Sequence, residues 1–551
     1  MDQHISLGGV DLVVFGAYML LTMVLGFMVA RGRVHKSTRG YFLGNSNLPW
    51  YVVGASMVST DLSSEHFIAN VGAGYRFGIV TATGSWNVWI IYSILLLIFL
   101  PYYMRSGIYT MPQFLEKRYN VACRYVFAFS LVIGYVTAIL AGALYAGGVA
   151  LETLFGLKVA WGIWIFALAT GTYTIYGGLA SAAWTDFMQM IVLLAAGILV
   201  PLLALWAVGG EGLASLVQEQ PEKFQVFLPA THPRFPLTGV FTGFLTVGLW
   251  YSCTSQHMVQ RYLSAKDEWH GRMGVILAGY LHIITPFFFV VPGLLAYTLL
   301  PNLDRPDHAY LALVKALVPT GLKGLILAGL AAALMSTVSA VLNSTSTLLT
   351  LDIYKKFINP DSTDRQNVFV GRVTTTLALL ASVAVAFYFE RKHDQTLFVL
   401  VQNIFFYIAP PFAVVFLMGL LWRRANQYGA MATIVLGFAF TWVLDKYLFK
   451  NVWFLIPYGQ AYQHRAIVAW AFCMAIMVVV SLLTPRPAAE QVDGIIWSWR
   501  IARMPAELRE RYSGWKDYRI WWAGFVLIIL GIYATFLWFR LQHPVAMFPT
   551  R

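Results

Sequence analysis

The chain has 551 residues, of which 59% are hydrophobic and only 11% are charged, whereas soluble domains carry about 25% charged residues. Such a composition cannot cover the polar surface of a soluble protein of this length, so it excludes a soluble enzyme, a disordered chain and a disulfide-rich secreted scaffold. The formal net charge is +13, and the three cysteines are too few and too scattered for a disulfide framework or a zinc site. The sequence therefore predicts an all-α polytopic membrane protein.

Apolar segments follow one another along the whole chain. A membrane-spanning helix needs about 20 apolar residues, and about fourteen segments reach this length. An even number of spans places both termini on one side of the membrane. The predicted spans lie near 9–30, 48–70, 80–104, 122–152, 158–178, 184–208, 237–260, 272–300, 321–350, 367–389, 396–421, 428–447, 464–484 and 519–540.

The distribution of Lys and Arg predicts the orientation, because cytoplasmic loops are enriched in both. With both termini outside, about 24 of the 38 Lys and Arg residues fall in inner loops. The segment 485–518 is rich in Arg and Trp, which predicts an interfacial segment in contact with membrane lipid. Because no basic run is dense or interleaved with aromatic residues, nucleic acid is not an expected partner. We expect an integral protein of the plasma (inner) membrane.

Two predicted spans carry polar residues where lipid would demand apolar ones. The second span contains Asp61, Glu65 and His66, and the ninth contains the string STVSAVLNSTST at 336–347. Polar groups at this depth are costly unless they face protein or a water-filled cavity. Two such segments, far apart in the sequence, predict a polar path near the membrane midplane.

Ser336 and Thr337 suggest what this path could bind. Hydroxyl and carbonyl oxygens suit a small, hard cation that must leave again easily. If the second span breaks around 59–63, its freed carbonyls could complete a five-oxygen sodium site with the two hydroxyls. The alternative is that these hydroxyls bond back to their own helix or join two helices.

Three further groups are candidates for binding. Asp61 and His66 could hold a polar solute by hydrogen bonds, or belong to a satisfied network between helices. His282 lies in the middle of the eighth span, where a binding site, a proton relay and a packing hydrogen bond are all compatible with a lone histidine. Asp186 lies at the predicted inner end of a span and could bind a departing cation or complement a helix dipole.

The sequence contains no motif of ATP-driven transport or hydrolysis. It has no Gly-Lys dipeptide and hence no phosphate-binding Walker loop, so we expect no obligate ATPase subunit. It has no HExxH or GxSxG motif either. An enzyme would have to rely on Asp61, Glu65 and His66 as its acid and base, and we therefore expect that the chain is not an enzyme.

Strings between about Asp11 and Arg424 resemble the sodium/solute symporter family, above all its sodium–sugar cotransporter branch. They are YFLGNSNLPWYVVGAS, SGIYTMPQFLEKRYN, IYGGLASAAWTD, VQRYLSAK, LNSTSTLLTLDIYKKFI and LMGLLWRR. The resemblance implies a LeuT-like inverted repeat of five plus five helices with extra flanking helices. It divides the chain into a first flanking helix and inner loop (1–47), a transport core (48–425, with repeats 48–236 and 237–425) and C-terminal flanking helices (426–551).

The resemblance also implies cation sites. A second sodium site, present in part of the family, would use Asp186, Ser336 and Ser339 with a further hydroxyl one position on. This chain has Ala340 there, which leaves the number of sodium ions per solute open. The implied general sodium site consists of the backbone oxygens of Ser59, Leu62 and Ala333 and the hydroxyls of Ser336 and Thr337.

The implied solute pocket departs from that of the sugar branch. Gln402 matches the sugar-binding glutamine, and Phe398 and Tyr251 match the residues that sandwich the sugar ring. However, Asp61 stands where a sugar-binding Asn is usual, and Ser85 replaces an acidic ligand. Since buried polar groups select against ligands that leave them unpaired, we expect a solute other than glucose or galactose. The candidate solute-binding residues are Asp61, His66, Ser85, Tyr251, His282, Phe398 and Gln402.

Together these features predict a sodium-coupled symporter that imports a small polar organic solute, a sugar or polyol, by alternating access. A nucleoside, an amine-bearing compound and a carboxylate are alternative solutes. A proton-coupled porter, a sensor and a passive channel are alternative modes of action, since Asp61, His66 and His282 would permit proton coupling. The expected partners are sodium, the solute and membrane lipid, in a monomer or weak homodimer.

Overall fold

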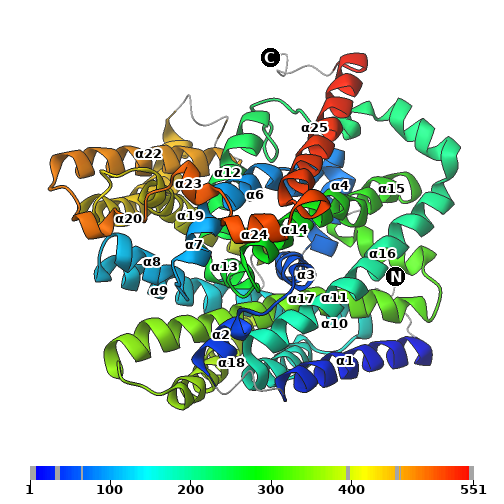
Figure 1. The fold of residues 1–551 in the computed structure, drawn as a ribbon. Coiled ribbons are helices and arrows are strands. Elements are labelled where there is room, and N and C mark those ends of the chain that lie inside the picture. Colours follow the sequence, from blue (N-terminus) through cyan, green and yellow to red (C-terminus); the bar gives the residue numbers. More distant parts are fainter. Residues whose placement is uncertain are drawn as a thin grey trace.

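The computed structural model describes residues 8–31, 37–63, 66–303, 305–392, 397–452, 458 and 461–544, and it describes their side chains except at 153–155, 307, 392 and 397–406. The structure is 84% helical and has no strand in this part of the chain, which confirms the all-α class (Figure 1). The helices of the described residues are α1 (Gly9–Ala30), α2 (Thr38–Leu43), η2 (Gly44–Ser46), α3 (Trp50–Asp61), η3 (His66–Asn70), α4 (Val71–Phe77), η4 (Gly78–Ala82), α5 (Thr83–Trp86), α6 (Val88–Ile94), η5 (Leu95–Phe99), α7 (Leu100–Arg105), α8 (Met111–Arg118), α9 (Val121–Gly134), η6 (Tyr135–Leu140), α10 (Ala141–Phe155), α11 (Val159–Glu219), η7 (Pro221–Phe224), α12 (Leu237–Cys253), α13 (Gln256–Leu263), α14 (Glu268–Phe289), α15 (Val291–Leu299), η8 (Pro306–His308), α16 (Ala309–Leu317), α17 (Leu322–Thr347), η9 (Leu348–Ile358), α18 (Asp364–Lys392), α19 (Leu397–Leu421), α20 (Gln427–Val443), η10 (Leu444–Leu448), α21 (Phe449–Asn451), α22 (Tyr462–Leu483), η12 (Ala489–Gln491), α23 (Trp499–Ala502), α24 (Ala506–Arg511), η13 (Gly514–Lys516) and α25 (Tyr518–Gln542).

Ten helical segments of the described chain are long and apolar enough to cross a membrane, from Gly9–Ala30 to Tyr518–Gln542. Two shorter apolar helices, Leu237–Cys253 and Tyr407–Leu421, lie in further predicted spans. These helices agree with an integral membrane protein. The count of fourteen spans and the placement of both termini outside stay predictions.

The segment α11 covers two predicted spans. The chain turns sharply inside it at Gly178, between the two spans. Gly178 has φ 58° and ψ −150°, a conformation that favours glycine. A Cβ atom here would lie 2.4 Å from the carbonyl oxygen of Tyr41 on α2. Gly178 therefore permits both the reversal and the close approach of α2.

The second predicted span is interrupted, as its polar residues suggested. α3 ends at Asp61, Leu62 has the extended values φ −80° and ψ 102°, and helical backbone resumes at His66. Residues such as Ser59, Thr60, Asp61 and Ser63 have a lower helix propensity than Ala or Leu, which favours a helix end here. Glu65 lies outside the described residues. A second interruption, not expected from the sequence, separates α12 from α13 at 254–255.

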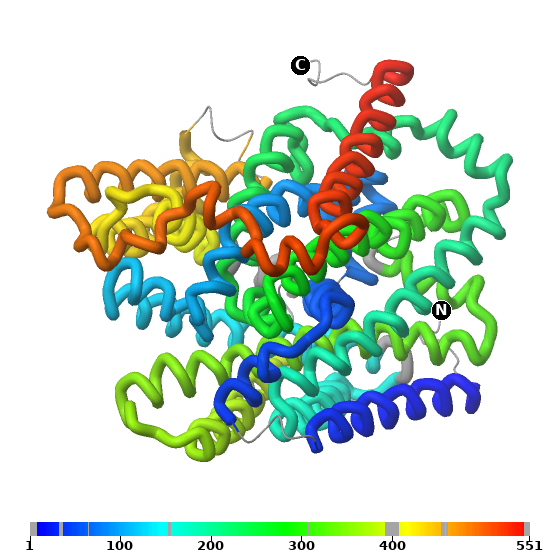
Figure 2. The backbone as a smooth tube through the Cα atoms, in the orientation of Figure 1, coloured from blue at the N-terminus to red at the C-terminus, as the bar shows by residue number. Residues whose placement is uncertain are grey.

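The polar helix α17 occupies the centre of the bundle (Figures 1 and 2). In the segment Leu322–Ile358, which contains α17, 94% of the most apolar 18-residue stretch is buried. The corresponding shares for α1 and α25 are 17% and 11%. The serines and threonines of α17 therefore face protein instead of lipid, which removes most of the cost of their depth.

The half-helix α4 packs backbone to backbone against α15, and this contact gives a stability prediction. A Cβ atom on Gly293 would lie 2.1 Å from the carbonyl oxygen of Val71 and 2.6 Å from the backbone nitrogen of Tyr75. We expect Gly293→Ala to lower the free energy of unfolding by about 1–3 kcal/mol, because backbone atoms cannot yield cheaply. Thermal unfolding in detergent measures this change.

Gly531→Ala is the matched control, since Gly531 lies within α25 with no atom within 4 Å of an added Cβ. It should leave the melting temperature unchanged or raise it slightly. Equal melting temperatures for the two variants would contradict the prediction.

Candidate functional site

The hydroxyls of α17 meet the broken end of α3. Ser336 Oγ lies within hydrogen-bond distance of two carbonyl oxygens, those of Ser59 at 2.6 Å and Ala333 at 3.0 Å. Thr337 Oγ1 lies 3.2 Å from the carbonyl oxygen of Thr60 and 3.1 Å from that of Ala333. Each hydroxyl therefore bonds back along its own helix and also reaches across to α3, which are the two kinds of contact that the alternative to a sodium site foresaw. The sodium site itself stays a prediction.

Some buried hydroxyl groups at this junction have no hydrogen-bond partner among the described residues. The side-chain hydroxyls of Ser59 and Thr60 are buried and have no hydrogen-bond partner among the described residues. Leu62 follows directly, with an extended backbone at the end of α3. An oxygen-rich junction of this kind suits a small hard cation, which supplies what these oxygens lack.

Asp186 lies in a second buried polar cluster beside this junction. Its carboxylate accepts a hydrogen bond from Ser56 Oγ on α3 at 2.6 Å and contacts Ser339 Oγ on α17 at 3.4 Å. An Arg261 nitrogen on α13 lies 3.2 Å from Asp186 Oδ2, and both side chains are buried. Because Asp186 lies two turns beyond the reversal at Gly178, it does not cap a helix N-terminus.

Arg261 is a functional candidate that the sequence reasoning missed. Its place between predicted spans assigned it to the basic inner loops, but its side chain is only 1% exposed. A single Arg among apolar and aromatic residues gives no signal that distinguishes a buried ion pair from a loop charge.

A cavity of about 310 Å³ adjoins the oxygen-rich junction and brings together five of the seven predicted solute-binding residues. Thr60, Leu62 and Thr337 also line it, so the cavity and the oxygen-rich junction share a wall. Phe398 and Gln402 lie on α19, but their side chains fall outside the described residues. The five predicted residues in the wall are Asp61, His66, Ser85, Tyr251 and His282.

Asp61 is the central polar group of this cavity. Its Oδ2 lies 3.4 Å from His282 Nε2 on α14, and Tyr251 on α12 also hydrogen-bonds to it. His66 is oriented by Ser63, whose backbone nitrogen donates to His66 Nδ1 at 3.1 Å. A carboxylate with imidazole and phenol neighbours can accept hydrogen bonds from a ligand rich in donors.

The other end of the cavity is lined by residues that the sequence reasoning did not identify. Arg234 and Phe235 precede α12, while Tyr462 and Gln463 begin α22. Gln463 Nε2 donates to the carbonyl oxygen of Arg234 at 3.0 Å, which ties the two segments together. These segments are more than 200 residues apart along the chain, and no motif marks either of them.

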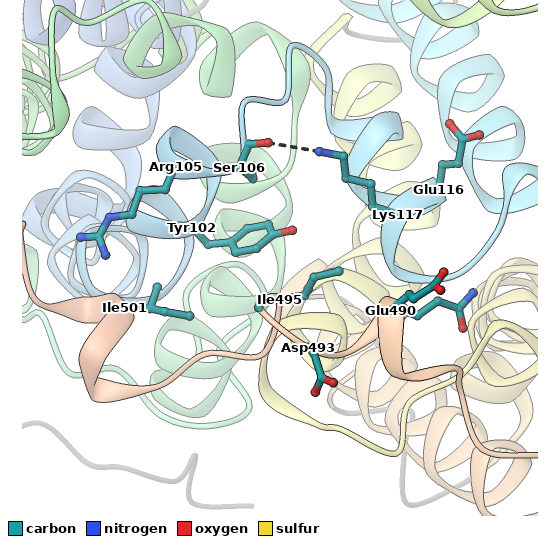
Figure 3. A pocket seen from close by; sticks show the side chains of 11 residues that line it. Tyr102, Arg105, Ser106, Glu116, Lys117, Glu490, Asp493, Ile495 and Ile501 are labelled. Atoms are coloured by element: carbon teal, nitrogen blue, oxygen red, sulfur yellow. Dashed lines mark hydrogen bonds between the residues drawn. The ribbon is translucent and has the colours of Figure 1, made fainter.

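The segment 485–518 packs against helix ends and, with α7 and α8, lines a separate open pocket of about 560 Å³ (Figure 3). Arg105 lies in its wall and forms an ion pair with Glu268 at 2.7 Å. Arg272 donates to the carbonyl oxygen of Ala502, which anchors the segment. Trp515 is 81% exposed, in keeping with an interfacial position, but the segment as a whole also packs against the bundle.

The junction offers oxygen atoms to a cation, and the cavity beside it offers polar groups to a small solute. This arrangement could bind the two ligands side by side.

Comparison with known proteins agrees with this arrangement. The family model described as "Sodium:solute symporter family" matches residues 41–437. The chain is 33% identical to the sodium/glucose cotransporter of Vibrio parahaemolyticus, over 87% of this chain and 91% of that protein. It is 31% identical to the sodium/mannose cotransporter of Bos taurus, over 90% of each.

The fold is shared with solved transporter structures. A Na+-coupled sialic acid symporter in a substrate-bound outward-open state superimposes with a TM-score of 0.77, at 21% identity, over 87% of this chain and 99% of that one. Mhp1, a nucleobase-cation-symport-1 family transporter, has a TM-score of 0.51 at 16% identity, over 82% of this chain and 97% of that one. The chain is thus a transporter, not an enzyme, and it belongs to the sodium:solute symporter family.

Proposed function

We propose that this symporter imports a sugar or polyol together with sodium by alternating access. The observation that carries the proposal is the shared wall: Thr337 contributes to the oxygen-rich junction and also lines the central cavity. A cation bound at one side of this wall would shape the solute site on the other. Relatives named for glucose, mannose and myo-inositol transport support a polyhydroxylated solute.

The cation would act by joining α3 to α17. Its proposed ligands are the carbonyl oxygens at the end of α3 and at Ala333, together with the two hydroxyls of α17. Sodium can shift the equilibrium toward the outward-open state only if it binds that state more tightly. The membrane potential then contributes about 2.3 kcal/mol per transported charge per 100 mV. The proposed sodium ligands are Ser59, Leu62, Ala333, Ser336 and Thr337.

We propose a LeuT-like core with inverted repeats at 48–236 and 237–425. The two interrupted helices support this division, since the α3 break lies near the start of the first repeat and the α12–α13 break near the start of the second. Broken helices at matching places in two repeats are typical of transporters that bind their ligands at the midplane. The proposed setting is the plasma (inner) membrane, with both termini outside and the protein a monomer or weak homodimer.

Asp61 favours an amine-bearing solute as the second candidate. In the described wall of the cavity, Arg234 at the far end is the only permanently cationic side chain, while Asp61 faces His282 and Tyr251. An ammonium group on the solute would pair with this carboxylate, and an anionic solute would be repelled by it. A neutral sugar would instead donate hydroxyl hydrogen bonds to it.

Uptake into proteoliposomes tests the function. We expect a sugar, polyol or amino compound, found first by a thermal-shift screen with and without sodium, to accumulate only under an inward sodium gradient. Sodium should also be required for solute-dependent thermal stabilisation, because the ion helps to form the site. Accumulation driven by a pH gradient would favour the proton-coupled alternative, and equilibration without accumulation would favour a channel.

A further inference from the structure

His257 is a buried histidine behind the wall of the central cavity, and the proposed mechanism gives it no role. It lies on α13, is 1% exposed and does not itself line the cavity. Its ring is edge-on to the ring of Tyr251 on α12, with the ring centres 5.0 Å apart. Tyr251 does line the cavity, and it hydrogen-bonds to Asp61. His257 therefore packs behind a residue that faces the solute.

Polar contacts fix the His257 ring to a third helical segment, η6. His257 Nδ1 lies 2.8 Å from Ser255 Oγ and 3.0 Å from the hydroxyl of Tyr135 on η6, and the two hydroxyls are 2.9 Å apart. The Tyr135 hydroxyl also accepts a hydrogen bond from the backbone nitrogen of His257 at 3.2 Å. Because α13 has no side-chain cap of its own at Ser255, Tyr135 supplies a partner for one of its free N–H groups.

These contacts span the break between α12 and α13. Ser255 has the extended values φ −75° and ψ 127°, so the backbone hydrogen bonds of one helix do not continue into the other. The relative direction of the two helices then depends on side-chain contacts. His257 provides one of them, since it belongs to α13 and packs against Tyr251 on α12.

We propose that His257 is a positioning residue for the solute, because its ring, held by Tyr135 and Ser255, keeps the Tyr251 hydroxyl on Asp61. A hydrogen-bonded network of buried side chains holds its members in one arrangement. An edge-to-face contact between rings transmits that arrangement to Tyr251. Displacement of the His257 ring lets Tyr251 turn away from Asp61, and the solute site loses its shape. This inference rests on the proposed symport of a polar solute.

Two substitutions of His257 separate its two contacts. His257→Phe keeps a ring against Tyr251 but removes the nitrogen that contacts Ser255 and Tyr135. His257→Asn keeps a polar atom near the position of Nδ1 but removes the ring. We expect each variant to raise the solute KM by about 10-fold and to keep the maximal rate within about two-fold, since it weakens one hydrogen bond to a charged group. A role confined to stabilising the start of α13 would leave the KM of the asparagine variant unchanged. Initial rates of solute uptake into proteoliposomes measure both quantities.

Tyr251→Phe tests whether His257 acts through the Tyr251 hydroxyl. Residues that act through one another have non-additive effects in a double-mutant cycle, so in this background either change at His257 should raise the KM by about two-fold at most. Tyr262→Phe is the matched control. Tyr262 is a buried tyrosine on the same helix, and its hydroxyl has no hydrogen-bond partner among the described residues. This variant should keep the wild-type KM.

The results distinguish this inference from the proposed function. A wild-type KM in the His257→Asn protein overturns the inference, as does full additivity with Tyr251→Phe. Loss of sodium-dependent thermal stabilisation in solute-free variants overturns it too, since His257 would then act on the cation. If His257→Phe yields no folded protein, Tyr135→Phe removes the hydroxyl alone and should raise the KM in the same way. Wild-type uptake that ignores sodium overturns the proposed function and leaves the comparison of KM values intact.

Discussion

Replacing Ser336 and Thr337 together by alanine is expected to abolish sodium-driven accumulation of the solute. The two hydroxyls contact the carbonyl oxygens of Ser59, Thr60 and Ala333, and they supply two of the five proposed sodium ligands. Each lost contact to a charged group costs about 1.5–3 kcal/mol. The sodium affinity should therefore fall by on the order of 100-fold or more. Initial uptake rates at increasing sodium concentration measure this loss.

Thr345→Ala is the control for this double variant. Thr345 is buried on the same helix, but its hydroxyl donates to the carbonyl oxygen of Val341 within that helix. The control should keep the wild-type sodium dependence, and sodium-dependent thermal stabilisation should persist in it while disappearing in the double variant. If the double variant keeps wild-type half-saturation by sodium, the assignment of the two hydroxyls is wrong.

The break in the second predicted span, where α3 ends, and the burial of α17 could be predicted because their polar residues conflict with a lipid environment. Short polar side chains at 59–63 weaken a helix locally, and hydroxyls at 336–347 are too costly to face lipid. Both signals arise within a single segment. The meeting of the two segments followed from the family resemblance and from the chemistry of oxygen ligands, not from periodicity.

The features that could not be predicted depend on tertiary packing. Arg261 lies by sequence between two predicted spans, and only its position against α11 shows that it pairs with Asp186. In the cavity wall, one hydrogen bond joins Gln463 to Arg234, and no motif marks either segment. The need for glycine at 178 depends in part on the backbone of Tyr41, which lies too close for a side chain. None of these contacts leaves a local pattern in the sequence.

The positions of the proposed cation and solute sites make their effects separable by experiment. The junction uses backbone oxygens around Asp61, whereas the Asp61 side chain points to His282 and Tyr251 across the cavity. A change confined to this side chain should therefore act on the solute and spare the cation. Linkage between the two ligands would remain, since both depend on the same end of α3.

Asp61→Ala is accordingly expected to raise the solute KM by on the order of 100-fold, because the solute loses a charged acceptor and His282 and Tyr251 lose a partner. Asp61→Asn keeps the shape and one acceptor oxygen, so for a sugar or polyol the rise in KM should be only about 10-fold, near 1.4 kcal/mol. For an amine-bearing solute the asparagine variant should be as defective as the alanine variant, since an amide cannot balance an ammonium charge. Sodium-dependent stabilisation without solute should persist in both variants. Its disappearance would show that the Asp61 carboxylate binds the cation, and the separation of the two sites would then be wrong.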